Sequence, residues 1–164
     1  MTNDAKKIII GSDHAGYAMK EIVKRFLLDR DMEVKDVGTD GETSVDYTDF
    51  GIKVAGLVSA GEFQRGILVC GTGIGMSMVA NRFKGVRAAL ANDLFSAIMS
   101  RRHNNSNILV MGGRVIGDSL ALKLIEAWLE TSFEGGRHQR RLEKMDQLKK
   151  TKRTKGKQEI RSLL

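Results

Sequence analysis

The chain has 164 residues, of which 41% are hydrophobic and 29% are charged. These values fit one soluble domain with a substantial core, and the apolar runs are too short for a membrane-spanning helix. The single cysteine, Cys70, excludes an intramolecular disulfide and a zinc site built from cysteine pairs. Because the first residues also lack the long apolar stretch of a secretory signal, we expect a cytoplasmic protein.

The net charge of +7 is concentrated at the C-terminal end. Ten Lys or Arg against three acidic residues lie between Arg140 and Arg161, whereas the rest of the chain is neutral. We therefore predict one domain over residues 1–149 and a basic tail over 150–164. A basic tail can bind nucleic acid without sequence preference, but a solvated extension is the commoner outcome for such a charge run and is the interpretation we favour.

Short apolar runs alternate with longer amphipathic segments along the chain, which is typical of a parallel sheet covered by helices. The predicted strands lie near residues 7–11, 33–37, 66–70, 86–91 and 107–111. The predicted helices between and after them span residues 15–30, 48–61, 74–82, 93–102 and 118–131. The sequence thus predicts an α/β, Rossmann-like three-layer fold with a five-stranded parallel sheet.

A sixth helix is predicted near residues 137–149. It is mostly charged, and its apolar residues Leu142, Met145 and Leu148 form only a thin stripe. A helix of this kind can reach across to a partner subunit.

Ligands of open α/β sheets bind beyond the carboxyl ends of the strands, so the loops around the predicted strands are the candidate site. After the third strand, Gly71, Gly73 and Gly75 follow a G-x-G-x-G spacing where a helix begins. Such a loop presents backbone N–H groups to an anion. Met76 stands where a dinucleotide fingerprint requires glycine, and no phosphate loop of the nucleotide-binding type occurs. We expect a small oxyanion here rather than a nucleotide cofactor, the alternative being a tight turn without a ligand.

The titratable residues near this loop suggest acid–base chemistry. Cys70 ends an apolar strand, where a lone cysteine is often an inert core residue, but an adjacent helix N-terminus favours the thiolate that a base requires. His14 and His103 also flank predicted strands. Arg137 and Arg141, spaced i, i+4, share one helix face and can hold a phosphate dianion, although such a pair can also be a solvated surface.

The histidines give no metal signature. No two of His14, His103 and His138 share a helix-turn spacing, and Cys70 has no second cysteine beside it. The sequence therefore predicts neither a catalytic nor a structural metal.

Five segments closely resemble the ribose-5-phosphate isomerase B family, which also contains galactose-6-phosphate and allose-6-phosphate isomerases. They are GSDHAG (11–16), DYTDFG (46–51), GILVCGTGIGMSMVANRFKGVRAAL (66–90), SRRHNNSNILVMGGRVIG (100–117) and FEGGRHQRRLE (133–143). The resemblance covers roughly residues 6–149. It departs from the family at Thr48, where a proline is common, and in the basic tail.

The resemblance implies a role for each matching residue. Cys70 would move a proton between C1 and C2 of the sugar, Thr72 would act at the substrate oxygens, and Asp13 and His103 would open the sugar ring. Members that use a glutamate as the base carry it at the position of Gly75, so this chain resembles the cysteine subtype. The remaining implied contacts are the amides of Gly71, Gly73, Ile74 and Gly75 to the enediolate, Tyr47 and Asn104 to hydroxyls, and His14, Arg114, Arg137 and Arg141 to phosphate.

The resemblance also implies a homodimer, or a dimer of dimers, whose sites are built from both subunits. It predicts reversible isomerisation of D-ribose 5-phosphate and D-ribulose 5-phosphate through a cis-enediolate, without metal or cofactor. The alternatives are isomerisation of a hexose 6-phosphate, such as allose or galactose 6-phosphate, and a non-catalytic sugar-phosphate-binding protein. An RNA-binding role of the tail is disfavoured, because the tail lacks aromatic residues on which bases could stack.

Overall fold

The computed structural model describes residues 6–148, and within them the predicted alternation of strands and helices is confirmed. The strands are β1 (Lys7–Ser12), β2 (Glu33–Asp36), β3 (Gly66–Cys70), β4 (Ala88–Leu90) and β5 (Ile108–Gly112). The helices are α1 (Tyr17–Leu28), α2 (Tyr47–Ser59), α3 (Ile74–Ala80), α4 (Leu94–Arg102), α5 (Asp118–Glu130) and α6 (Arg137–Leu148). The largest differences from prediction are at β4, which is shorter, and at α1, which begins two residues later.

The late start of α1 has a local cause. The Asp13 carboxylate accepts a hydrogen bond from the Gly16 backbone N–H at 3.0 Å, which closes a turn directly after β1. This turn occupies the first residues of the predicted helix. Asp13 and His14 are thereby held at the end of the strand instead of joining α1.

The sheet has the strand order β2-β1-β3-β5-β4, and every neighbouring pair is parallel. β3 and β5 are buried along their whole length, as is expected for strands covered on both faces. The chain runs outward from β1 to β2 and then returns to β3 on the other side of β1. The crevice between the carboxyl ends of β1 and β3 is therefore the place where this topology favours a ligand.

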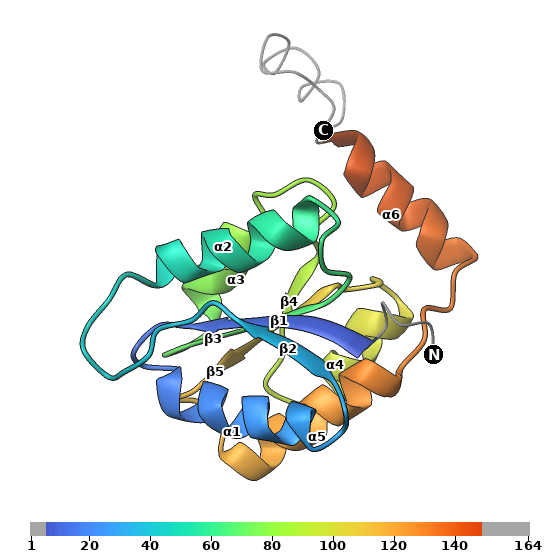
Figure 1. Cartoon of the computed structure of the whole chain (residues 1–164). Coiled ribbons are helices and arrows are strands. Elements are labelled where there is room, and N and C mark those ends of the chain that lie inside the picture. The colour runs from blue at the N-terminus through green and yellow to red at the C-terminus, as the bar shows by residue number, and fades with distance from the viewer. Residues whose placement is uncertain (1–5, 149–164) are drawn as a thin grey trace, which may run out of the picture.

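Two helical layers enclose the sheet (Figure 1), with α1, α4 and α5 on one face and α2 and α3 on the other. Each layer has its own apolar core against the sheet. The largest side chain of the first core, Trp128, is fully buried, and its indole N–H donates to the Ser106 hydroxyl at 2.7 Å. This bond ties α5 to the short turn that precedes β5.

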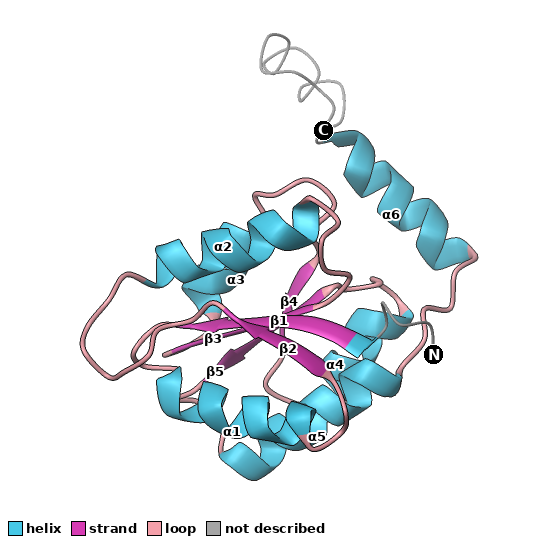
Figure 2. Ribbon diagram, in the orientation of Figure 1, coloured by secondary structure: helices cyan, strands magenta, loops and turns pink. Residues whose placement is uncertain are grey.

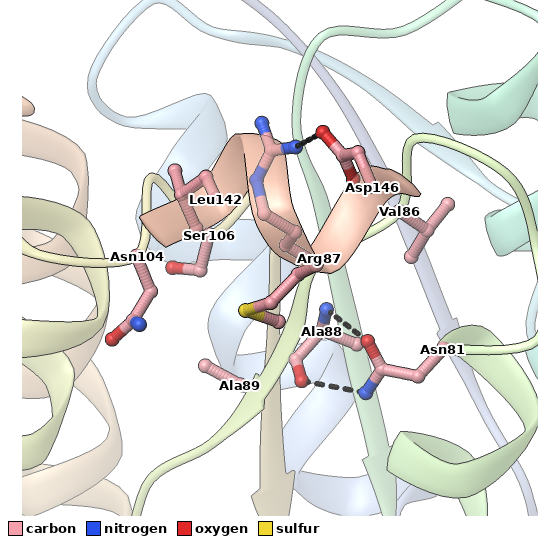
Figure 3. A pocket seen from close by; sticks show the side chains of 10 residues that line it. Asn81, Val86, Arg87, Ala88, Ala89, Asn104, Ser106, Leu142 and Asp146 are labelled. Atoms are coloured by element: carbon pink, nitrogen blue, oxygen red, sulfur yellow. Dashed lines mark hydrogen bonds and ion pairs between the residues drawn. The ribbon is translucent and has the colours of Figure 1, made fainter. Parts of the chain in front are cut away.

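Helix α6 stands away from the two layers at the end of a long connection (Figure 2). His138 and Leu142, one turn apart on α6, are buried, whereas Met145 is 53% exposed. A groove of about 520 Å³ remains between α6 and β4, lined on the helix by Leu142, Met145 and Asp146 (Figure 3). The predicted contact of α6 with a partner subunit stays a prediction.

The side chain of Asn81 forms hydrogen bonds with the outer edge of β4. The amide of Asn81 donates to the Ala88 carbonyl at 2.9 Å and accepts from the Ala88 N–H at 3.0 Å (Figure 3). Asn81 thus replaces the neighbouring strand that an edge strand lacks.

The predicted basic tail lies outside the described residues. In the part of the chain that the structure describes, no helix has the length and apolar character needed to cross a membrane.

Candidate active site

Cys70 is the last residue of β3, at the carboxyl edge of the sheet. Its side chain is buried, and its sulfur accepts a hydrogen bond from the Gly73 backbone N–H at 3.1 Å. A donor aimed at sulfur stabilises a thiolate more than a thiol, because the sulfur carries more negative charge in the thiolate. The local geometry therefore suits Cys70 to act as a base.

The predicted glycine loop turns tightly around this sulfur. Gly73 has φ +78°, in the left-handed region, and a Cβ there would overlap Leu90 and lie 3.0 Å from the Met111 carbonyl carbon. Only glycine fits both the backbone conformation and the space. The Thr72 hydroxyl accepts from the Ile74 N–H at 3.3 Å, at the point where α3 begins.

Tyr47 and Arg114 border the loop from other elements. A Cβ on Gly75 would lie 2.6 Å from the Tyr47 ring, so this ring at the start of α2 packs directly on the Gly75 backbone. After β5, the Gly113 N–H donates to the Cys70 carbonyl at 2.8 Å, and the Arg114 N–H donates to the Gly71 carbonyl at 3.0 Å. The loops after β3 and β5 are thus hydrogen-bonded into one rim.

Asp13 and His14 complete this rim from the end of β1, the strand adjacent to β3. Asp13 is 5% exposed and is fixed by its bond to Gly16. Nδ1 of His14 accepts from the Val45 N–H at 3.2 Å, which assigns the proton of a neutral ring to Nε2. The structure therefore brings together Asp13, His14, Tyr47, Cys70, the loop from Gly71 to Gly75 with Thr72, and Arg114.

His103 and Asn104 lie at the opposite edge of the sheet. They follow α4 and precede β5, and the register pairs the first residue of β5, Ile108, with Gly66 and the last, Gly112, with Cys70. Four strand residues, or about 13 Å, thus separate the two edges along the sheet. Within one chain, His103 is not brought to Cys70.

A second group of side chains gathers around His103. Its ring stacks on that of His138 with centroids 4.1 Å apart, and Nε2 of each ring faces the Glu134 carboxylate, at 3.8 Å from His103 and 3.5 Å from His138. Arg102 donates to the other carboxylate oxygen of Glu134 at 2.6 Å. This group therefore joins the end of α4 to the start of α6.

The charges of this group are set by its contacts. The hydrogen bond from Arg102 holds the pKa of Glu134 below its usual range. Burial, followed by the charges of His103 and Arg137, lowers the pKa of His138. At neutral pH a carboxylate and a neutral imidazole thus flank His103.

Arg137 and Arg141 lie on α6 beside this cluster. Arg137 Nε donates to His138 Nε2 at 3.3 Å, and both arginines are close enough to act electrostatically on His138. Their predicted i, i+4 placement on one helix is confirmed, and both side chains are exposed. His103, Asn104, Arg137 and Arg141 form the second part of the predicted site.

Sequence spacing missed the contact between two histidines. His103, Glu134 and His138 place possible metal-ligand atoms within 4.8 Å of one another, although 35 residues separate the histidines in the sequence. The two rings are parallel to within 4°, and a metal bound by both would have to lie in both ring planes. Parallel stacked rings share no plane, so this arrangement is poorly suited to a metal held by both histidines. The i, i+4 spacing of Glu134 and His138 was the signal that could have revealed the contact between these two residues.

A known protein family matches most of this chain. The model of the ribose/galactose isomerase family matches residues 8–145. The chain belongs to this family. Ribose-5-phosphate isomerase B of Escherichia coli is 45% identical over 138 residues, covering 84% of this chain and 93% of that protein.

Solved structures share the fold. A ribose-5-phosphate isomerase B of Clostridium thermocellum superposes with a TM-score of 0.87 at 51% identity, over 88% of this chain and 97% of that one. The enzyme of Mycoplasma genitalium, solved with bound ribulose-5-phosphate, gives a TM-score of 0.86 at 39% identity, over 89% and 97% of the two chains. The Rossmann-like fold predicted from the sequence is confirmed by these structures and by the sheet itself.

Replacing Gly73 by alanine tests the fit of the glycine loop. A left-handed conformation costs a non-glycine residue about 1–2 kcal/mol and overpacking a further 1–3 kcal/mol, so we expect a loss of about 2–5 kcal/mol in the free energy of unfolding. Urea denaturation measures this loss. Gly41→Ala is the matched control, because a Cβ there meets no atom within 4 Å and the change should be nearly neutral. Equal effects of the two substitutions would contradict the predicted steric constraint at Gly73.

Proposed function

We propose that this protein interconverts D-ribose 5-phosphate and D-ribulose 5-phosphate, with Cys70 as the base. The observation that carries the proposal is the buried Cys70 sulfur with the Gly73 N–H at 3.1 Å, set in a rim of backbone amides in a member of the ribose/galactose isomerase family. Relatives named ribose-5-phosphate isomerase B, one of them with ribulose-5-phosphate bound, favour a pentose phosphate. The family description also includes galactose, so a hexose 6-phosphate is the second candidate substrate.

The first chemical step is the opening of the sugar ring. A base takes the proton of the anomeric hydroxyl while an acid protonates the ring oxygen, which yields the open aldehyde. We assign these roles to Asp13 and His103, a buried carboxylic group and an imidazole facing the Glu134 carboxylate. Tyr47 and Asn104 would hold the sugar hydroxyls, and His14, Arg114, Arg137 and Arg141 the phosphate.

Isomerisation then moves one proton between neighbouring carbons. The Cys70 thiolate takes the proton from C2, and the electron pair passes to the C1 carbonyl oxygen to give the cis-enediolate. Thr72 assists the exchange of a proton between the two oxygens, and the thiol returns its proton to C1. C2 is oxidised as C1 is reduced, so no external electron acceptor is needed. Amide N–H groups of Gly71, Gly73, Ile74 and Gly75 would stabilise the negative oxygens, as in other preorganised anion sites.

The separation of the two groups of residues supports a site shared between two copies of the chain. Cys70 and His103 lie at opposite edges of a rigid parallel sheet, so a second copy must supply one of them. Apolar side chains are exposed on α3 and at the start of α4, next to the Cys70 rim; they are Ile74, Met78, Leu94 and Phe95. A homodimer, or a dimer of such dimers, would cover them and bring α6 of one subunit to the other.

The proposed chemistry also requires a reducing compartment, because Cys70 must remain a free thiol. The cytoplasm satisfies this requirement.

The proposed function is tested by comparing kcat/KM for ribose 5-phosphate, allose 6-phosphate and galactose 6-phosphate in a buffer with a strong chelator. We expect ribose 5-phosphate to be the best substrate and the chelator to leave its rate unchanged, since no step uses a metal. A higher kcat/KM for a hexose 6-phosphate would move the assignment to the second candidate. Absence of activity with all three sugars would indicate a non-catalytic sugar-phosphate-binding protein instead of an isomerase.

Cys70→Ala tests the identity of the base. A positioned acid–base group contributes about 10²–10⁴-fold, so kcat should fall by that factor while the substrate still binds. Steady-state kinetics measure the fall, and calorimetric titration with ribulose 5-phosphate measures the binding. Retention of more than about a tenth of the wild-type kcat would exclude Cys70 as the base.

Arg141→Ala and Arg140→Ala distinguish a phosphate contact from general surface charge. The two residues are neighbours on α6 but point about 100° apart on an ideal helix. Loss of one charge-assisted contact should lower kcat/KM about ten- to a hundredfold for Arg141→Ala, mainly through KM, and for Arg137→Ala likewise. Arg140→Ala, the matched control with the same charge change, should have much less effect. Equal losses at positions 140 and 141 would indicate a diffuse electrostatic role instead.

Mixing two inactive variants tests the shared site. Cys70→Ala and His103→Ala subunits, unfolded and refolded together, should form hybrids in which one of the two sites contains neither substitution. Random pairing should restore about a quarter of the wild-type activity. The control mixture of Cys70→Ala with Thr72→Ala, whose substitutions lie on the same rim, should gain nothing. Recovery in neither mixture would mean that Cys70 and His103 do not meet across an interface.

A further inference from the structure

A second hollow lies at the amino edge of the sheet, away from the Cys70 rim. It has a volume of about 320 Å³, and three arginines line it: Arg65 before β3, Arg87 before β4 and Arg101 in α4. Its other lining side chains are apolar or amides, and no acidic residue of the described chain is among them. The isomerisation proposed above uses none of these arginines.

Backbone carbonyls hold all three arginines in place, and among residues 6–148 Arg87 alone also has an acidic partner, Asp146. Arg65 Nη1 donates to the Leu129 carbonyl at 2.8 Å, and Arg87 Nε donates to the Asn105 carbonyl at 3.0 Å. Arg101 Nη1 donates to the Ser106 carbonyl and, at 3.1 Å, to the Asn105 amide oxygen. Within the described residues the Nη2 groups of Arg65 and Arg101 donate no hydrogen bond. Fixed guanidinium groups with free donors are preorganised to receive an oxyanion.

Packing against an aromatic ring limits the motion of two of these groups further. The guanidinium carbons of Arg65 and Arg101 each lie 5.6 Å from the centre of the Trp128 ring. Trp128 is itself fully buried. Both guanidinium groups therefore lie beside the same buried ring.

The hollow has a surplus of positive charge. Burial, followed by the charges of Arg65 and Arg87, lowers the pKa of Arg101 to about 10, so that Arg101 is still protonated at neutral pH. Among residues 6–148, one ion pair involves these arginines: Arg87 lies 4.0 Å from Asp146 of α6. Asp146 is half exposed and lines the groove between α6 and β4 (Figure 3). A bound anion would relieve the repulsion among the three cations.

We propose that this hollow, defined by Arg65, Arg87 and Arg101, binds the phosphate group of a small phosphorylated metabolite at a site separate from the substrate site. The volume admits a phosphate group with part of the molecule attached to it. Three guanidinium groups supply forked donors of the geometry that phosphate oxygens accept.

The hollow is also connected to the turn that carries His103 and Asn104. The next residue, Asn105, has φ +45°, an uncommon conformation for a residue other than glycine, and Arg87 and Arg101 both hydrogen-bond to it. An anion that draws these arginines toward itself acts on the same turn. Binding should therefore be visible at the Asn105 backbone.

The test is a titration with inorganic phosphate followed by amide chemical shifts, in an Arg137→Ala background that weakens the proposed substrate site. We expect the amides of Arg65 and Asn105 to shift along one saturable curve, apart from any shift at residues 71–75. Adding Arg65→Gln should weaken this curve about tenfold or more, the loss expected for one charge-assisted contact. The same titration with glycerol 3-phosphate distinguishes free phosphate from a phosphate ester as the ligand. Tighter binding of the ester would identify a phosphorylated metabolite.

Arg25→Gln is the matched control, with the same charge change on the exposed face of α1, and it should leave the curve unchanged. Arg65→Lys, which keeps the charge but loses the fork, guards against a folding defect of Arg65→Gln and should weaken binding to a smaller extent. The proposal is overturned if Asn105 does not shift, if shifts occur only at residues 71–75, or if Arg65→Gln and Arg25→Gln behave alike. Because activity is not the readout, failure here leaves the proposed isomerase function untouched.

Discussion

The parallel direction of all neighbouring strands is the constraint on which the rest of this structure depends. Each strand must be followed by a helix that carries the chain back, so residues after a strand and residues before the next lie at opposite edges. Cys70 follows this rule at the carboxyl edge and His103 at the amino edge. Their separation is therefore a property of the topology, and no change of side-chain rotamer would remove it.

At the carboxyl edge, short-range geometry fixes the position of the Cys70 sulfur. The left-handed turn at Gly73 points an N–H at the sulfur, and the loop after β5 ties the Cys70 carbonyl into the same rim. These bonds come from backbone atoms, whose positions are fixed by the buried strands β3 and β5. As the proposed base, Cys70 would therefore need little reorganisation when its charge changes.

The amino edge collects positive charge, in two different arrangements. Around His103, the Glu134 carboxylate is hydrogen-bonded to Arg102 and offsets the nearby cations. In the neighbouring hollow, Arg65 and Arg101 are held by carbonyls and an aromatic ring, and no acidic residue among the described residues pairs with them. In the first arrangement a carboxylate already balances nearby cations, whereas the second leaves room for the external anion proposed above.

The sequence by itself determined the alternation of strands and helices, the glycine loop beside Cys70 and the i, i+4 arginines of α6. Each of these depends on residues close together in the chain, whose periodicity or conformational preference is local. The strand order, the stacking of His103 on His138 and the meeting of Arg65, Arg87 and Arg101 were decided only by the tertiary structure. Those contacts join segments tens of residues apart, and they depend on how helices pack over the sheet, which local patterns do not encode.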